Sequence, residues 1–139
     1  MTNTTHTLRT GLAAAALLLA GAAPALAASP SAADSENWLY VTVTQGEDNR
    51  AGDSHGTLLL CDPPQGHAHA AEACDELGAA QGDVGRIPAK KEVYCSMIYA
   101  PVTVTAQGEW NGRRTEYQKT YPNACTMEAE TGAVFALSD

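Results

Sequence analysis

Four cysteines constrain the fold of this 139-residue chain more than any other feature of its sequence. They are widely spaced, no two of them form a Cys-x-x-Cys pair, and they stand at Cys61, Cys74, Cys95 and Cys125. An even number of cysteines in an oxidising compartment predicts disulfide bonds, here two. A zinc site is the competing interpretation, but the wide spacing, with only His67 and His69 nearby, favours disulfides. Four cysteines allow three pairings, and spacing alone selects none of them.

The N-terminal segment indicates that the chain enters such a compartment. A polar start that carries Arg9 leads into an uninterrupted apolar run, Gly11–Ala23, and Ala25-Leu26-Ala27 then supplies the small-x-small pattern that signal peptidase accepts. A transmembrane anchor is the alternative, but the run is short for a bilayer and no cationic flank follows it. We therefore predict a signal peptide over residues 1–27, secretion to the extracellular medium, and no membrane attachment after cleavage.

The rest of the chain has the composition of one small domain preceded by a linker. Residues 28–36 are rich in Ala, Ser and Pro, which is typical of a flexible N-terminal arm. Residues 37–139 contain the recurring apolar positions that a core requires, and all four cysteines. The folded domain is therefore expected to span 37–139.

Hydrophobic periodicity predicts the elements of this domain. Alternating or β-branched stretches predict strands over residues 38–44, 57–61, 114–121 and 133–137, and a further strand that begins at Val102. Apolar residues at Ala70, Cys74 and Leu77 predict one helix within 68–80, and residues 122–125 are expected to form a turn. This pattern is typical of an α+β domain: a five-stranded antiparallel β-sheet covered by one or two short α-helices.

The chemistry available to the chain argues against several classes of function. A net charge of −8 disfavours nucleic acid and anionic membranes as partners. The sequence lacks a Gly-x-Ser-x-Gly elbow, a Gly-rich phosphate loop and a His-Glu-x-x-His motif. His67 and His69 are expected on the solvated surface, as are the helix acids Glu72, Asp75 and Glu76. We therefore predict no enzymatic activity, no catalytic residue, no cofactor and no metal.

The most informative stretch runs from Cys95 to Pro101, where Met97, Ile98 and Tyr99 stand together. One interpretation is that Met97 and Ile98 are buried strand residues. The other is an exposed, rigid loop, because a cysteine and a proline of fixed φ bracket the stretch and an irregular segment precedes it. A rigid loop that presents a large apolar side chain is what a protease cleft would recognise as substrate.

At these residues the sequence resembles the subtilisin inhibitor family of streptomycetes, which are secreted inhibitors of serine proteases. The resemblance covers essentially all of the chain after the predicted signal peptide. The matching motifs are a Leu-Leu-Cys strand end followed by Pro-Pro-x-Gly-His, Cys95-x-Met97-Ile98-Tyr99-x-Pro101-Val102, Trp110-x-Gly112-x-Arg114, Asn123-x-Cys125-x-Met127 and Ala133-Val134-Phe135-Ala136.

The resemblance implies a fold and a site. It implies a five-stranded antiparallel sheet with two short helices, the disulfides Cys61–Cys74 and Cys95–Cys125, and a homodimer. By the same alignment the reactive bond is Met97–Ile98, with Met97 as the P1 residue. The protease-binding loop then contains Tyr94 at P4, Cys95 at P3, Ser96 at P2 and Tyr99, and its supports are Asn123 and Pro101.

The chain departs from the family pattern at two loop positions. Ser96 stands where the family often has proline, so a restraint on φ is lost, and Ala100 stands where the family often has an acid. The function implied is substrate-like inhibition of subtilisin-like and chymotrypsin-like extracellular serine proteases. Two alternatives remain open: a secreted, disulfide-stabilised binding or structural module without inhibitory activity, and an inhibitor or partner in extracellular transglutaminase maturation.

Overall fold

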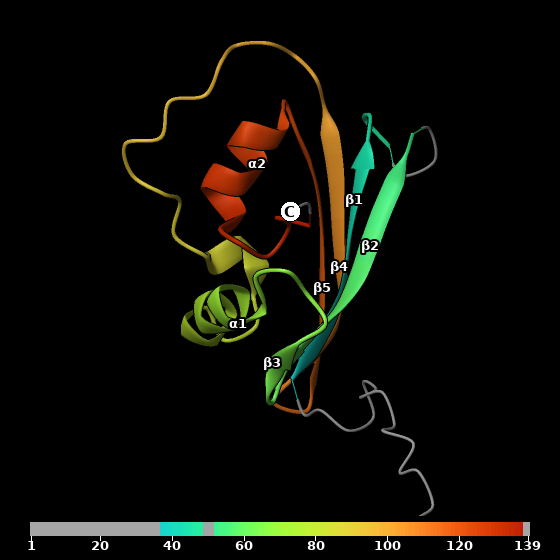
Figure 1. The fold of residues 1–139 in the computed structure, drawn as a ribbon, viewed down its shortest axis with the longest axis vertical. Coiled ribbons are helices and arrows are strands. Elements are labelled where there is room, and N and C mark those ends of the chain that lie inside the picture. Colours follow the sequence, from blue (N-terminus) through green and yellow to red (C-terminus); the bar gives the residue numbers. More distant parts are fainter. Residues whose placement is uncertain (1–36, 49–51, 138–139) are drawn as a thin grey trace, which may run out of the picture.

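The computed structural model describes residues 37–48 and 52–137 (Figure 1). Its centre is an antiparallel sheet with the strand order β3-β2-β1-β4-β5. The strands are β1 (Trp38–Gln45), β2 (Ser54–Cys61), β3 (Pro64–Gln65), β4 (Val102–Trp110) and β5 (Arg113–Tyr121). The helices are α1 (Ala70–Ala79), the short 3-10 helix η2 (Val84–Arg86) and α2 (Ala124–Thr131). The predicted α+β class is confirmed, whereas the predicted signal peptide and arm lie outside the described residues.

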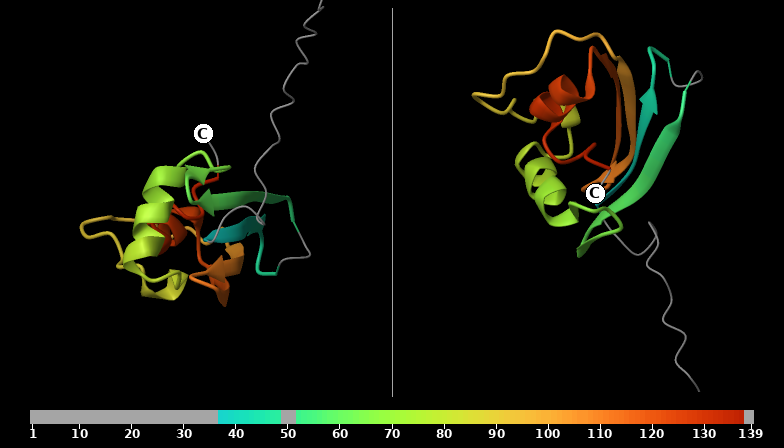
Figure 2. Two further views of the ribbon diagram at one scale, coloured as in Figure 1. Left: turned by 90° about the horizontal axis from the view of Figure 1, so that it is seen from below. Right: turned by 45° about the horizontal axis from the view of Figure 1, so that its top comes forward.

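Both α-helices lie on the same face of the sheet (Figures 1 and 2). The hydrophobic core is formed by residues of the helices and of this face of the sheet. The alternation predicted for β1 is present, since Leu39 and Val41 are fully buried while Tyr40 between them is half exposed. Each fully buried side chain of this size adds about 1.5–3 kcal/mol to stability. The buried positions of α1 repeat at helical spacing and are Ala70, Ala73, Cys74 and Leu77. Within the described residues, no helix is both long and apolar enough to cross a membrane.

Two disulfides connect these layers, and their pairing is the one that the family resemblance implies. Cys61 at the end of β2 is bonded to Cys74 on α1, with Cα atoms 5.4 Å apart. Cys95, in the segment before β4, is bonded to Cys125 in the first turn of α2, with Cα atoms 5.6 Å apart. By the loop-entropy argument the two bonds stabilise the fold by about 3 and about 3.7 kcal/mol.

The C-terminal segment differs from the prediction. Residues 133–137 were expected to form a strand, but they form a turn and an irregular stretch between the helices and the sheet (Figure 1). Val134 and Phe135 are almost fully buried there, and a short buried apolar run has the same pattern in a strand as in a packed turn. The fifth strand is β3 instead. The expected turn at 122–125 is the start of α2, which Asn123 caps by accepting a hydrogen bond from the Thr126 amide at 2.9 Å.

Two side chains expected on the solvated surface have structural roles. His67 is only 9% exposed, and its Nε2 lies 3.1 Å from the carbonyl oxygen of Val134. Its Nδ1 accepts a hydrogen bond from the backbone amide of His69 at 2.9 Å. Glu76, a half-buried α1 residue, accepts a hydrogen bond from the Ala133 amide at 2.7 Å. The contacts of His67 with Val134 and of Glu76 with Ala133 join segments far apart in the sequence, which local periodicity cannot indicate.

Candidate functional site

The segment between η2 and β4 is an exposed loop without regular secondary structure over residues 93–100 (Figure 1). Of the six large apolar side chains exposed on the described part of the chain, five lie in this loop. Met97 is fully exposed, and Tyr94, Ile98 and Tyr99 are 93%, 70% and 64% exposed. The buried-strand interpretation of Met97 and Ile98 is therefore wrong. An apolar cluster held out in water on a monomer marks an interaction site.

The loop is fastened to α2 on its N-terminal side. The amide of Lys90 donates a hydrogen bond to the Ala129 carbonyl of α2 at 2.7 Å. Further along, the Cys95–Cys125 disulfide joins the loop to the first turn of the same helix. Met97 is therefore two residues from a covalent link to an ordered helix, although its own side chain touches no core.

Asn123 joins the loop to the N-terminus of α2 through the amide nitrogen and the oxygen of its side chain. Its Nδ2 donates hydrogen bonds to the carbonyls of Ser96 and Ile98, each at 3.1 Å. Its Oδ1 accepts from the amide and the hydroxyl of Thr126 at 2.9 and 3.0 Å. A backbone N–H can only donate and a carbonyl can only accept, so these four contacts determine the orientation of the amide. One side chain thus holds the backbone on both sides of Met97.

The C-terminal side of the loop is held by the residue that follows β5 and by the first residues after β1. The Ala100 amide donates to the Pro122 carbonyl at 2.9 Å, and the Pro101 carbonyl accepts from the Gly46 amide at 2.8 Å. The Tyr99 hydroxyl donates to the Glu47 carboxylate, and this hydrogen bond raises the pKa of Tyr99. Among these residues only Pro101 and Tyr99 were predicted site residues. No local sequence pattern could have indicated the role of Glu47, because 52 residues separate it from Tyr99.

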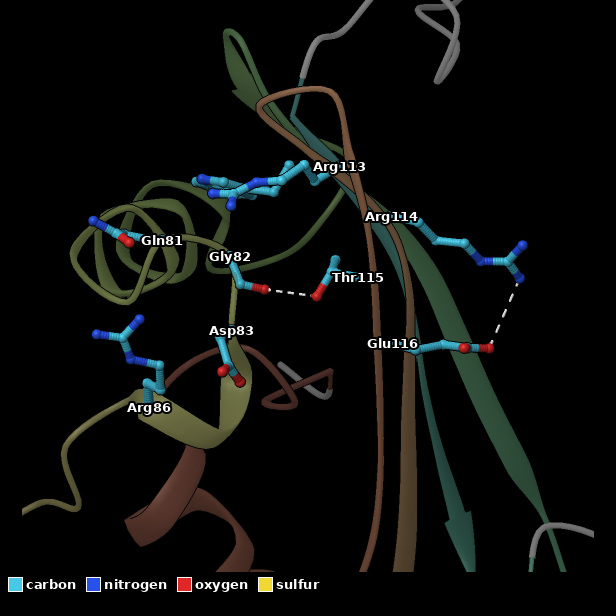
Figure 3. A pocket seen from close by; sticks show the side chains of 9 residues that line it. Gln81, Gly82, Asp83, Arg86, Arg113, Arg114, Thr115 and Glu116 are labelled. Atoms are coloured by element: carbon cyan, nitrogen blue, oxygen red, sulfur yellow. Dashed lines mark hydrogen bonds and ion pairs between the residues drawn. The ribbon is translucent and has the colours of Figure 1, made fainter.

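A cavity of about 400 Å³ lies elsewhere, between the end of α1, η2 and the β4–β5 turn (Figure 3). It collects all three arginines of the described residues, Arg86, Arg113 and Arg114, together with Asp83 and Glu116. Arg114 lies 3.8 Å from Glu116, and both side chains are largely exposed. No residue of the 93–100 loop lines this cavity, so the cavity and the loop are separate features.

The loop has the form of a ligand rather than of a cleft that holds one. It protrudes, its backbone is fixed on both sides of Met97, and its apolar side chains face solvent. All four cysteines are in disulfides, so no thiol nucleophile is present. On the part of the chain that the structure describes, no group of three or more His, Cys, Asp or Glu side chains is placed to hold a metal ion.

Comparison with known proteins agrees with this reading. A protein of Streptomyces avermitilis is 58% identical over the whole of this chain and 92% of its own length. The subtilisin inhibitor of Streptomyces albogriseolus is 37% identical, with 91% of this chain and 85% of that protein covered. Streptomyces caespitosus sermetstatin, solved in complex with Bacillus licheniformis subtilisin, matches with a TM-score of 0.59 and 34% identity over 71% of this chain and 96% of that one.

The family model described as Subtilisin inhibitor-like matches residues 35–123, which is more than half of the chain. That range holds β1 to β5, the first three cysteines and the exposed loop with Asn123. The chain belongs to the subtilisin inhibitor-like family, whose members are protease inhibitors and not enzymes.

Proposed function

We propose that this protein is a secreted inhibitor of subtilisin-like and chymotrypsin-like serine proteases, with Met97–Ile98 as its reactive bond. The observation that supports this most is the fully exposed Met97 between two carbonyls that Asn123 holds. A rigid loop loses little conformational freedom on binding, so a small interface can be tight.

The proposed mechanism is substrate-like. The protease serine attacks the carbonyl carbon of Met97, and its oxyanion hole stabilises the charge that develops on the carbonyl oxygen. In a flexible peptide the new amine of Ile98 would diffuse away, and water would complete hydrolysis. Here the Cys95–Cys125 bond and Asn123 keep both sides of the bond in place, so religation is faster than release.

The exposed side chains suggest the class of protease. Met97 at P1 is unbranched and apolar, which suits subtilisin-like and chymotrypsin-like pockets, whereas trypsin-like proteases require a basic P1 residue. Tyr94, at 93% exposure, is available to an apolar S4 pocket, and Ser96 and Tyr99 complete the contact surface. Ser96 lacks the φ restraint of proline, and the hydrogen bond from Asn123 to its carbonyl restrains the same residue.

The proposal includes export and assembly. Residues 1–27 are proposed to direct secretion, and N-terminal sequencing of protein from a culture supernatant would show Ala28 first. A homodimer is proposed from the family resemblance, because no element of the described chain covers the sheet face opposite the helices (Figure 2). Light scattering during gel filtration measures its mass directly.

An inhibition titration against subtilisin tests the function. We expect stoichiometric, slow-tight inhibition by the oxidised protein, loss of inhibition in Met97→Asp, and inhibition of trypsin by Met97→Lys. Tyr40→Lys is the matched control, since it also places a lysine at an exposed apolar position but lies on β1 and should not create trypsin inhibition. Full subtilisin activity with excess folded protein would refute the proposal and favour a non-inhibitory binding module.

A further inference from the structure

We propose that Glu47 is a positioning residue for the reactive loop: through Tyr99 it holds the amine side of the Met97–Ile98 bond and so limits the accumulation of cleaved inhibitor. This inference rests on the proposed function. It goes beyond that function because it assigns a supporting role to the β1–β2 connection, which lies outside the loop, α2 and the disulfides.

The first step is that Glu47 is itself held by the sheet. Its carbonyl accepts a hydrogen bond from the Thr120 hydroxyl of β5 at 3.2 Å. The carbonyl of the preceding Gly46 accepts from the Thr103 hydroxyl of β4 at 2.9 Å, and the two threonine hydroxyls lie 2.9 Å apart. Thr103 is almost fully buried. The backbone that carries the Glu47 carboxylate is therefore tied to two paired strands of the sheet.

The second step is that this connection holds the amine side of the loop at two points. The Tyr99 hydroxyl donates to the Glu47 carboxylate, and the Gly46 amide donates to the Pro101 carbonyl at 2.8 Å. Tyr99 directly follows Ile98, the residue that carries the new amine after cleavage. The disulfide lies on the other side of the bond, at Cys95, so it restrains this half of the cleaved loop only through Asn123 and α2.

The third step concerns the equilibrium between intact and cleaved inhibitor. Religation requires the amine of Ile98 close to the acyl carbon of Met97, and holding the two together raises their effective concentration. Removal of the hydrogen bond from Tyr99 leaves the amine side held only by the backbone contacts of Ile98, Ala100 and Pro101. The amine side then moves more freely, which favours the cleaved form. A surface hydrogen bond to a carboxylate corresponds to roughly a three- to tenfold change in an equilibrium constant.

The experiment measures the ratio of cleaved to intact inhibitor at equilibrium with a catalytic amount of subtilisin. One sample starts from intact inhibitor and the other from cleaved inhibitor, and mass spectrometry quantifies both forms. Tyr99→Phe and Glu47→Ala should each raise the ratio about three- to tenfold, and the double variant should raise it no further. Tyr40→Phe removes the same hydroxyl from an exposed tyrosine on β1, outside the loop, and should leave the ratio unchanged. Glu47→Gln keeps an acceptor and should largely restore the wild-type ratio.

Two negative results have different meanings. If wild type inhibits but Tyr99→Phe has the same ratio as wild type and Tyr40→Phe, the role of Glu47 is refuted and the inhibitory function stands. If wild type does not inhibit subtilisin at all, the proposed function is refuted and the role of Glu47 with it. Thermal unfolding of each variant verifies that the sheet is intact, so a general loss of folding cannot imitate the expected shift.

Discussion

Asn123→Asp separates rigidity of the loop from stability of the fold, because the two ends of this side chain do different work. Aspartate keeps the oxygen that accepts from the amide and hydroxyl of Thr126, and it is as good an N-cap as asparagine. A negative charge at a helix N-terminus is favourable. The other end loses both donors to Ser96 and Ile98 and places a carboxylate oxygen against their carbonyls. Because this favourable charge offsets part of the two lost hydrogen bonds, we expect little change in the melting temperature and weaker inhibition.

The magnitude follows from the two lost hydrogen bonds. Both are near the surface, so about 0.5–1 kcal/mol each is appropriate, and about 1–2 kcal/mol in total raises Ki for subtilisin roughly five- to thirtyfold. Progress curves give Ki, and calorimetry gives the melting temperature. Asn111→Asp is the charge-matched control in the β4–β5 turn, and Asn123→Ala should lose about 1 kcal/mol of stability as well. A Ki for Asn123→Asp within twofold of wild type would refute the reasoning.

Three further predictions concern the scaffold. Replacing Cys95 and Cys125 together by serine should lower the free energy of unfolding by about 3.7 kcal/mol and turn the inhibitor into a substrate. Urea denaturation measures the first effect and a cleavage time course measures the second. A variant that the protease cleaves only slowly would contradict the second effect. Burial lowers the pKa of His67 below 6.5, so the unfolded chain binds a proton more readily and stability should fall as the pH drops below 6.5. His67→Gln should flatten this pH dependence when the free energy of unfolding is measured at pH 5.5 and 7.5. The same pH dependence in wild type and variant would exclude this role of His67. Gly78→Ala has open space around its new Cβ within α1 and should stabilise the fold by about 0.5–1 kcal/mol. Gly82→Ala should destabilise the fold, because its φ is +79° and its Cβ would lie 2.3 Å from an indole carbon. Thermal unfolding compares the two variants, and equal melting temperatures would refute the steric argument.

Local pattern was sufficient for the elements whose burial follows a simple period. The alternation around Leu39 and Val41 predicted β1, and the spacing of Ala70, Cys74 and Leu77 predicted α1 to within two residues at each end. In both elements one face contacts a single core, so the side chains that must be apolar recur at the period of the backbone.

The remaining elements depend on contacts that the period does not record. α2 buries only Met127 and Thr131, too few positions to produce a helical pattern, and its clearest sequence signal is the N-cap residue Asn123. Val134 and Phe135 are buried on several sides at once, so an apolar run there indicates burial but not strand geometry. β3 is a two-residue strand, shorter than any window in which alternation can be recognised.

In the candidate site, too, local sequence pattern predicts some features and long-range contacts determine the others. The exposure of Met97 could be predicted only from the cysteine and proline around it and from the family resemblance, because its own type predicts burial. The loop remains ordered without a core of its own because α2 serves as its platform: the N-cap residue binds two loop carbonyls, the first turn carries Cys125, and the Ala129 carbonyl accepts from Lys90. Each link uses a group that a short helix exposes at its end or on its surface. The loop therefore depends on a folded α2, so any change that loosens this helix should weaken inhibition even where it touches no protease.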